Sequence, residues 1–297
     1  MNRYIAFCRI AESGSFSKTA EEMGYSQSAV SQMIRSLEKE VRMALLIRSR
    51  GKVTLTEEGR ELLPKIRTIV NDYHLLNEKA GELQGLDSGE IRIGTIASVS
   101  HAWLPKMIRA FQKQYPDVRF SLAQGDYTAI AQWIRKDDVD FGFVNGDAVS
   151  GFHQIPLAHD EMLAILPPNH SLCAKAEICL EDLVGEPYIR LEEGDFNEPM
   201  NAFRAKKLKP SVRLKVYDDY TVMAMVEENL GYSIIPEMNL RRHDYKIEKR
   251  SLNPKITRNL CVVFGNKQNL PKMSRRFLRF ISENFSAFIN EGSPHES

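Results

Sequence analysis

Apolar residues in the first 60 positions recur at helical spacing in three short stretches. The turns between them are Ser13-Gly14-Ser15 and Gly24-Tyr25-Ser26. The pattern predicts a first helix over 2–13, a second over 18–23 with Ser17 as its N-cap, and a third over 27–41. Three short helices joined by tight turns are typical of a helix-turn-helix module.

The third predicted helix has two chemically different faces when its residues are placed at about 100° per residue. One face is apolar and is expected to pack on the first two helices: Val30, Ile34, Leu37 and Val41. The opposite face is polar and basic, with no acidic residue: Ser28, Ser31, Gln32, Arg35 and Lys39. Such side chains bind base edges and phosphates, as a recognition helix in the major groove requires. The alternative is an ordinary amphipathic surface helix.

Two short apolar runs, 46–48 and 53–55, flank the sequence Ser49-Arg50-Gly51-Lys52 and predict a hairpin with a basic tip. Beside a recognition helix such a hairpin is a wing, from which Arg48 or Arg50 reaches the minor groove or the DNA backbone. The net charge of the chain is only +1, but residues 1–60 hold ten Lys/Arg against seven Asp/Glu, a balance of +3. The basic charge is therefore local to the predicted DNA-binding module.

A long helix is expected after Thr56, a suitable cap, and ends at a hinge over 85–89. Apolar or small residues recur along it with heptad spacing: Leu62, Ile66, Ile69, Tyr73, Leu76, Ala80 and Leu83. Such a seam favours pairing with a second copy, although it could instead pack on the body of its own chain. Pro64 predicts a bend within the helix.

From Glu90 onward the pattern alternates between strands and helices, which indicates α/β structure with a parallel βαβαβ unit over 91–144. A second set of strands and helices follows over 162–264, and a last helix over 274–289. Two α/β lobes joined by crossover strands favour a ligand cleft between them.

Several motifs occur in order and together resemble the LysR-type transcriptional regulators. They are Phe16-Ser17-Lys18-Thr19-Ala20, the run from Ser26 to Glu38, Leu45-Leu46-Ile47-Arg48 and Leu55-Thr56-Glu57-Glu58-Gly59. The resemblance implies DNA contacts from the second helix, the third helix and the wing: Ser17, Lys18, Gln27, Ser28, Ser31, Gln32, Arg35, Arg48 and Arg50. Ser28, Arg42 and Leu46 stand where the family usually has proline, glycine and phenylalanine.

The remainder resembles the effector domain of the same family, whose fold is similar to that of periplasmic binding proteins. The points of resemblance include Val139-Asp140-Phe141-Gly142 and the run from Gly231 to Pro236. The predicted organisation is a winged helix-turn-helix over 1–56, a linker helix and hinge over 57–88, and an effector-binding domain over 89–297. Lobe I is expected over about 90–161 and 265–297, and lobe II over about 162–264.

The loop over 95–101 follows the first strand of the effector domain, and its hydroxyl and N–H groups suit a polar or anionic effector. Family position implies that Ser98 and Thr128 lie at the pocket, unless they are helix caps only. The full set of candidate effector residues is Thr95, Ser98, Ser100, His101, Thr128, Arg190 and Asp219.

The sequence carries no nucleophile elbow, phosphate loop, dinucleotide fingerprint or metal-spaced His/Cys set, so we expect neither an enzyme nor a bound cofactor. No apolar stretch is long enough to span a membrane, and a charged start without an apolar run predicts a cytoplasmic protein. The four cysteines are interpreted as small buried hydrophobes, with a redox pair of Cys173 and Cys179 as the alternative.

The expected partners are promoter DNA, a small effector, further copies in a dimer or tetramer, and RNA polymerase. A second hypothesis is a solute-binding or catalytic α/β protein with an accessory N-terminal helical module. Deleting residues 1–88 distinguishes the two, because only the second hypothesis leaves activity intact.

Overall fold

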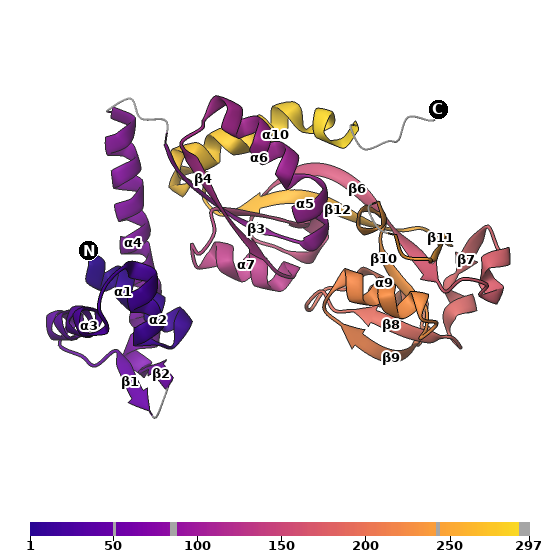
Figure 1. Ribbon diagram of the computed structural model, residues 1–297, viewed down its shortest axis with the longest axis horizontal. Helices are drawn as coiled ribbons and strands as arrows, with labels where there is room; N and C mark the ends of the chain where they lie inside the picture. Colours follow the sequence, from indigo (N-terminus) through magenta and orange to yellow (C-terminus); the bar gives the residue numbers. More distant parts are fainter. Residues whose placement is uncertain (50–51, 84–87, 242–243, 291–297) are drawn as a thin grey trace. The chain divides into compact units, whose positions relative to one another are not determined.

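The computed structural model describes residues 1–49, 52–83, 88–241 and 244–290 (Figure 1). The chain folds into two compact units, Met1–Asp87 and Ser88–Ser297. Each unit has hydrophobic clusters of its own, which is the mark of a separately folded domain.

The first unit is a winged helix-turn-helix, as predicted. Its elements are α1 (Asn2–Ser13), α2 (Phe16–Met23), α3 (Gln27–Val41), β1 (Leu46–Ser49), β2 (Lys52–Leu55) and α4 (Glu57–Leu83). Val30, Ile34 and Leu37 of α3 are fully buried in a core that also holds Phe7 and Phe16. The strands β1 and β2 pair antiparallel and form the predicted hairpin.

The predicted cap of α2 is wrong by two residues. The hydroxyl of Ser15, not that of Ser17, accepts the backbone N–H of Lys18, at 3.3 Å. Ser15 has the extended backbone of an N-cap, with φ at −144° and ψ at 126°, and the helix already includes Phe16. Ser17 therefore lies inside the first turn, where its exposed hydroxyl has no capping role.

Two residues shape the end of α3, Arg42 and Glu38. The sequence analysis had singled out only Arg42. Arg42 occupies the C-cap in the left-handed conformation, with φ at 56° and ψ at 33°, a geometry that glycine adopts without strain. Glu38 turns back to accept the backbone N–H groups of Leu45 and Leu46, at 2.8 and 3.3 Å. This carboxylate therefore holds the chain between α3 and the wing.

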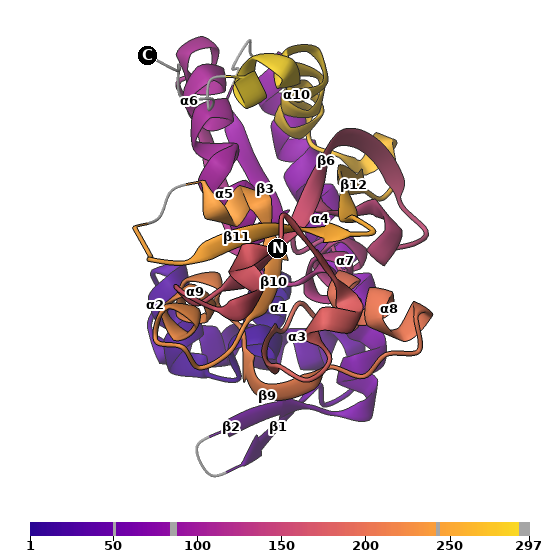
Figure 2. The same ribbon diagram turned by 90° about the vertical axis from the view of Figure 1, so that its right-hand side faces the viewer.

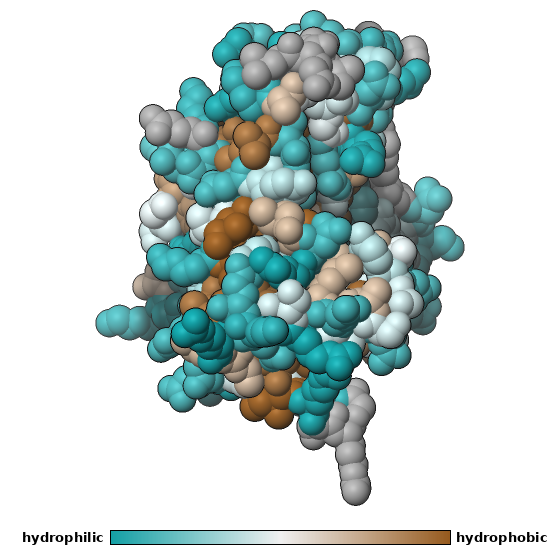
Figure 3. Space-filling view, turned by 90° about the vertical axis from the view of Figure 1, so that its left-hand side faces the viewer, coloured by the Kyte–Doolittle hydropathy of each residue, from teal (hydrophilic) through white to brown (hydrophobic). Residues whose placement is uncertain are grey.

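The linker helix α4 begins as predicted, with the Thr56 hydroxyl accepting the N–H of Gly59 at 2.9 Å. It runs through Pro64 as one helix. Ile66 is buried against the core of the first unit, whereas Ile69 and Leu76 are 43% and 65% exposed. Along the described part of the heptad seam, Leu62 and Ile66 thus pack on the core, whereas Ile69 and Leu76 are exposed. Figure 3 shows hydrophobic side chains scattered among hydrophilic ones on one face of the molecule.

The second unit is built on a mixed sheet with strand order β4-β3-β5-β12-β6-β11-β7, with β10 also paired to β6. Its first lobe contains the predicted parallel unit, β3 (Gly89–Thr95), β4 (Val118–Gln124) and β5 (Phe141–Asn145). Two long antiparallel strands, β6 (His153–Leu166) and β12 (Ile256–Phe264), pair with each other along both lobes. Figures 1 and 2 show these strands connecting the two lobes.

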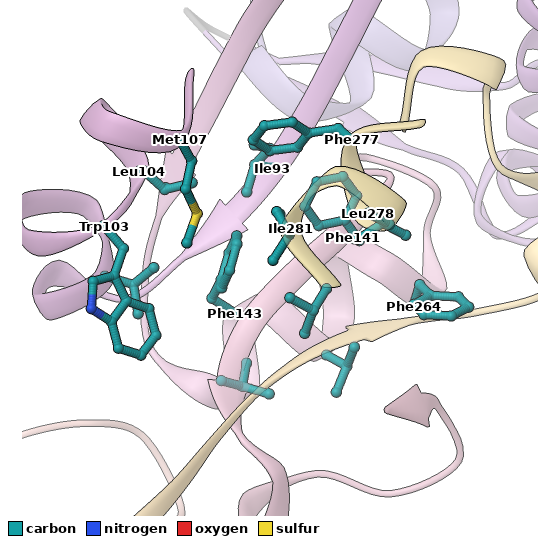
Figure 4. Packing of buried hydrophobic residues seen from close by; sticks show 14 of the residues in the cluster. Ile93, Trp103, Leu104, Met107, Phe141, Phe143, Phe264, Phe277, Leu278 and Ile281 are labelled. Atoms are coloured by element: carbon teal, nitrogen blue, oxygen red, sulfur yellow. The ribbon is translucent and has the colours of Figure 1, made fainter. Parts of the chain in front are cut away.

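Helices cover both faces of the lobe I sheet. They are α5 (Ala97–Ala102), α6 (Leu104–Gln114), α7 (Tyr127–Arg135) and α10 (Lys272–Asn290). Apolar residues from α6 and α10 meet those of β3 and β5 in one core, where Met107 and Phe277 pack near Ile93 and Phe141 (Figure 4). This packing fixes the ends of β3 and β5, and with them the loops that lead toward lobe II.

Lobe II contains β7 (Glu177–Cys179), β8 (Pro187–Leu191), β9 (Ser211–Val216), β10 (Ser233–Pro236), β11 (Glu248–Asn253), α8 (Glu198–Ala205) and α9 (Asp219–Glu227). The expected end of lobe II at residue 264 is too late. Ile256 packs in a lobe II core, but Leu260 to Phe264 belong to the lobe I core, because β12 crosses between the lobes. None of the four cysteines, all within the described residues, forms a disulfide; Cys8 and Cys261 are buried, but Cys173 is half-buried and Cys179 exposed.

Candidate functional site

The outer face of α3, defined as Ser28, Ser31, Gln32, Arg35 and Lys39, is open to solvent along most of its length. At its start the Ser26 hydroxyl caps the helix by accepting the N–H of Ala29 at 3.2 Å, and it bonds the Ser28 hydroxyl at 2.9 Å. Gln27, Ser28, Gln32 and Arg35 are all exposed. Amide, hydroxyl and guanidinium groups in this position can bond base edges and phosphates.

The wing is attached to this face by Arg48. Its guanidinium donates to the Ser31 hydroxyl at 3.1 Å and lies 4.3 Å from the centre of the Phe16 ring. Arg35 donates from Nε to the backbone oxygen of Ser31 at 3.4 Å. The structure therefore brings Ser31, Arg35 and Arg48 together. Of the other predicted DNA contacts, Ser17 and Lys18 are exposed at the start of α2, and Arg50 lies outside the described residues.

Both acidic residues of α3 are held away from the outer face. Glu38 is bonded to the backbone after the helix, as described above, and Glu40 pairs with Arg3 at 2.8 Å and with the Tyr4 hydroxyl at 2.9 Å. Carboxylates near phosphate would oppose binding. The arrangement leaves the outer face polar and basic, which suits the major groove of DNA.

A cavity of about 290 Å³ lies between the two lobes of the second unit. Lobe I contributes the start of α5, the end of β4 and the start of α7, and lobe II contributes the end of β8 and the start of α9. The lining residues are Ile96, Ala97, Gln124, Gly125, Asp126, Tyr127, Leu191, Glu192, Glu193, Tyr217 and Asp219. Inter-lobe cavities at the ends of strands are favoured ligand sites.

A buried arginine on β12 joins the elements around this cavity. Arg258 is 1% exposed and donates to Asp160 from Nε at 3.0 Å and from Nη2 at 2.8 Å. It also donates to the hydroxyl of Ser98, at 2.8 Å, and to that of Tyr127, at 3.3 Å. One side chain thus connects a crossover strand to α5 and α7.

A second buried contact links α8 of lobe II to lobe I. The Oε1 atom of Glu198 accepts the Tyr127 hydroxyl at 3.0 Å and the amide of Asn145 at 2.8 Å. The other carboxylate oxygen, Oε2, is buried with no hydrogen-bond partner among the described residues. Polar groups from both lobes therefore meet behind the cavity wall.

Two carboxyl groups that line the cavity have perturbed acidity. Burial raises the pKa of Glu193 to about 8, and the nearby charge of Glu198 adds to the effect. Glu193 is 16% exposed and lies 3.9 Å from Arg258. Burial also raises the pKa of Asp219, which is 8% exposed and whose Oδ1 atom bonds no group in the described part of the chain.

The predicted effector residues fall in different places. Asp219 lines the cavity. Ser98 does not line it, and its hydroxyl accepts a hydrogen bond from the buried Arg258. Thr95 and Ser100 bond each other at 3.2 Å, and the exposed ring of His101 lies 5.8 Å from that of Tyr220. Thr128 accepts the backbone N–H of Asp195 at 3.3 Å, and Arg190 donates to Glu192 at 2.8 Å.

The sequence analysis missed Tyr127, Glu193, Glu198 and Arg258. Arg258 had a detectable signal, because it alternates with Ile256 and Leu260 and so falls on the buried face of strand β12. In the described parts of the chain no cluster of three or more His, Cys, Asp or Glu side chains is placed to hold a metal ion. None of the described helices is long and apolar enough to cross a membrane.

Two family models match the chain. The model described as "LysR substrate binding domain" matches residues 84–286, and the model described as "Bacterial regulatory helix-turn-helix protein, lysR family" matches residues 1–60. The chain is 28% identical over 284 residues to the HTH-type transcriptional regulator YvbU of Bacillus subtilis, covering 95% of this chain and 97% of YvbU. It is 30% identical over 240 residues to the HTH-type transcriptional activator CmpR of Synechocystis, covering 79% and 78%.

A solved structure shares the fold across both units. Full-length CbnR in complex with its target DNA aligns with a TM-score of 0.66 at 18% identity, covering 95% of this chain and 98% of CbnR. At this identity the likeness concerns the fold alone.

Proposed function

Because the chain belongs to the LysR family of DNA-binding transcriptional regulators, which carry an effector-binding domain and are not enzymes, we propose that it recognises operator DNA through the outer face of α3 and the wing. The observation that carries this proposal is the position of the two α3 carboxylates, both bonded away from the outer face. The alternative, a solute-binding or catalytic protein with an accessory helical module, is not favoured by these relatives.

The residues divide into two roles by their position. Gln27, Ser28, Gln32 and Arg35 are exposed on the first turns of α3 and are proposed to contact base edges. Lys18 and the wing arginines are proposed to contact phosphates. Arg48 is already fixed against Ser31 and Phe16, so its charge is held in place beside α3 before DNA binds.

The exposed part of α4 supports assembly into dimers or tetramers. Ile69 and Leu76 lie on the heptad seam and are 43% and 65% exposed in the single chain. Burying such side chains against a second copy removes apolar surface from water, at about 25 cal/mol per Å². A dimer then presents two copies of α3 to two half-sites.

The inter-lobe cavity is the proposed effector site. A ligand that binds the two lobes better in one arrangement than in another shifts the population of that arrangement. The change is proposed to alter how the dimer holds its two half-sites and so its action on RNA polymerase. Since chromosomal DNA is the partner, the place of action is proposed to be the cytoplasm.

Selection from sheared genomic DNA tests the proposal. The full chain should enrich a small set of fragments that share one motif at moderate salt. Gln32→Ala and Arg35→Ala should lose this enrichment, whereas Gln114→Ala and Lys113→Ala, exposed on α6, should keep it. Enrichment without any shared motif would refute sequence-specific recognition.

A further inference from the structure

The inter-lobe cavity is lined by carboxylates and not by bases. Asp126, Glu192, Glu193 and Asp219 contribute to the lining, and none of the described residues that line it is Lys, Arg or His. Asp126 is already used, since it caps α7 by accepting the N–H of Ala129 at 2.7 Å. Glu192 is paired with Arg190 at 2.8 Å. Glu193 and Asp219 remain as the carboxyl groups available to a ligand; Asp219 also interacts with the side chain of Asn239, but its Oδ1 atom is unbonded among the described residues.

The buried arginine behind the cavity does not balance these two groups. Arg258 places two N–H groups on Asp160, and its contact with Glu193 is longer, at 3.9 Å. Glu198 adds a further buried carboxyl group to the same cluster. In this cluster of described residues, the positive charge of Arg258 therefore faces four acidic side chains: Asp160, Glu193, Glu198 and Asp219. The exposed His101 also faces Asp219.

One carboxylate oxygen in the cavity wall lacks a hydrogen-bond donor among the described residues. The Oδ1 atom of Asp219 is buried in the cavity wall and bonds no donor among the described residues. A buried acceptor without a donor is costly, so native proteins leave few of them. A ligand N–H would satisfy this oxygen.

The same cavity is a poor site for an anion. Helix N-termini attract anions through free N–H groups, but two of the three described helices that begin at the cavity, α7 and α9, are capped by carboxylates of the chain itself, and only the short α5 has no side-chain cap. Asp126 caps α7, and Asp218 accepts the N–H of Thr221 at 2.7 Å at the start of α9. A ligand carboxylate would also meet Glu193 and Asp219. Of the polar or anionic effector that the sequence favoured, only the polar alternative therefore agrees with this lining.

We propose that the effector carries a cationic nitrogen, an ammonium or a guanidinium, which binds between Glu193 and Asp219. This assignment rests on the proposed role of the cavity as the effector site. The aromatic rings of Tyr127 and Tyr217 also line the cavity, and such rings attract cations through their faces. A water molecule takes up about 30 Å³ in the liquid. The cavity, at about 290 Å³, is therefore large enough for a small metabolite.

Matched probes test the charge directly. The probes are 1,4-diaminobutane, 1,4-butanediol and butanedioate. They share a four-carbon chain and differ in the charge at its ends. Each is titrated into the full chain at constant ionic strength and near-neutral pH, with calorimetry and the melting temperature as readouts. A ligand that binds the native state raises the melting temperature. We expect the diamine alone to bind and to raise it.

Variants locate the binding. Asp219→Asn and Glu193→Gln should each weaken the diamine by about tenfold or more, since each replaces a carboxyl group that the bound cation holds in its charged form by an amide that cannot become charged. Asp117→Asn and Glu90→Gln, which are exposed elsewhere in the second unit, should leave its affinity unchanged. A second readout needs no ligand: at neutral pH the first two variants should melt higher than the unmodified chain, because burial opposes the charged form of both carboxyl groups and an amide has no charged form to lose.

Preference for the dicarboxylate or the diol, or no binding of the diamine, would overturn the proposal. So would equal losses in all four variants. The selection of genomic DNA described above uses no small molecule. Its failure would refute the regulatory function, whereas a wrong ligand class would leave that selection intact.

Discussion

Replacing Arg258 with methionine removes the connection between β12, α5 and α7. The substitution keeps much of the side-chain volume but leaves Asp160 without its partner. Asp160 is 4% exposed, and its remaining bond, at 3.2 Å, is to the backbone N–H of Met238. Ser98 and Tyr127 lose the same donor.

The expected loss follows from general measurements on buried ion pairs. Removing one partner of such a pair destabilises a protein by about 3–5 kcal/mol. For a unit of the size of Ser88–Ser297, each kcal/mol lowers the melting temperature by about 2–4 °C. Arg258→Met should therefore lower the melting temperature of the second unit by about 6–20 °C.

Calorimetric melting of the full chain measures this effect. Arg213→Met is the matched control, since Arg213 is exposed on β9, and it should shift the transition little. Adding Asp160→Asn to Arg258→Met should recover part of the loss, because it removes the buried carboxylate that accepted two N–H groups of the arginine. A melting temperature of Arg258→Met equal to that of Arg213→Met would refute the structural role of the arginine.

Three further predictions concern other parts of the chain. The pKa of Glu193 is raised from 4.5 to about 8, so its contribution to stability is complete below pH 4.5 and is lost as the pH rises through about 8; melting curves of the unmodified chain should therefore fall across this range more than those of Glu193→Gln, and parallel curves would contradict the assignment. Arg42→Gly should stabilise the first unit by about 1 kcal/mol by relieving the left-handed backbone, as measured by urea unfolding, and destabilisation would contradict it. Ile69→Glu with Leu76→Glu should reduce the oligomer to smaller species in sedimentation, and an unchanged mass would exclude this seam as the interface.

The helices of the first unit were predictable because each buries one regular stripe. The bounds of α1 and α3 agree with the sequence pattern, since their apolar residues recur at helical spacing. The cap of α2 was misplaced because Ser15 and Ser17 are both chemically suitable, and only the backbone conformation selects Ser15. The first half of β6 was missed because it is largely exposed and carries few apolar residues.

The cavity was harder to predict than the fold. Asp219 was among the candidate effector residues, and it lines the cavity. Glu193 gives no comparable signal, because several of the charged groups around it, such as Arg258 and Asp160, come from parts of the chain far away in the sequence. The sequence therefore indicated part of the cavity lining but not that this lining is acidic.

Relative affinities for every single-base variant of a selected operator test the account most directly. Gln32→Ala should relax discrimination at one position of each half-site by about 1–3 kcal/mol and leave the other positions unchanged. Lys18→Ala should instead weaken binding to all variants alike. A Gln32→Ala chain that keeps full discrimination, or that loses affinity uniformly, would contradict base recognition by the outer face of α3.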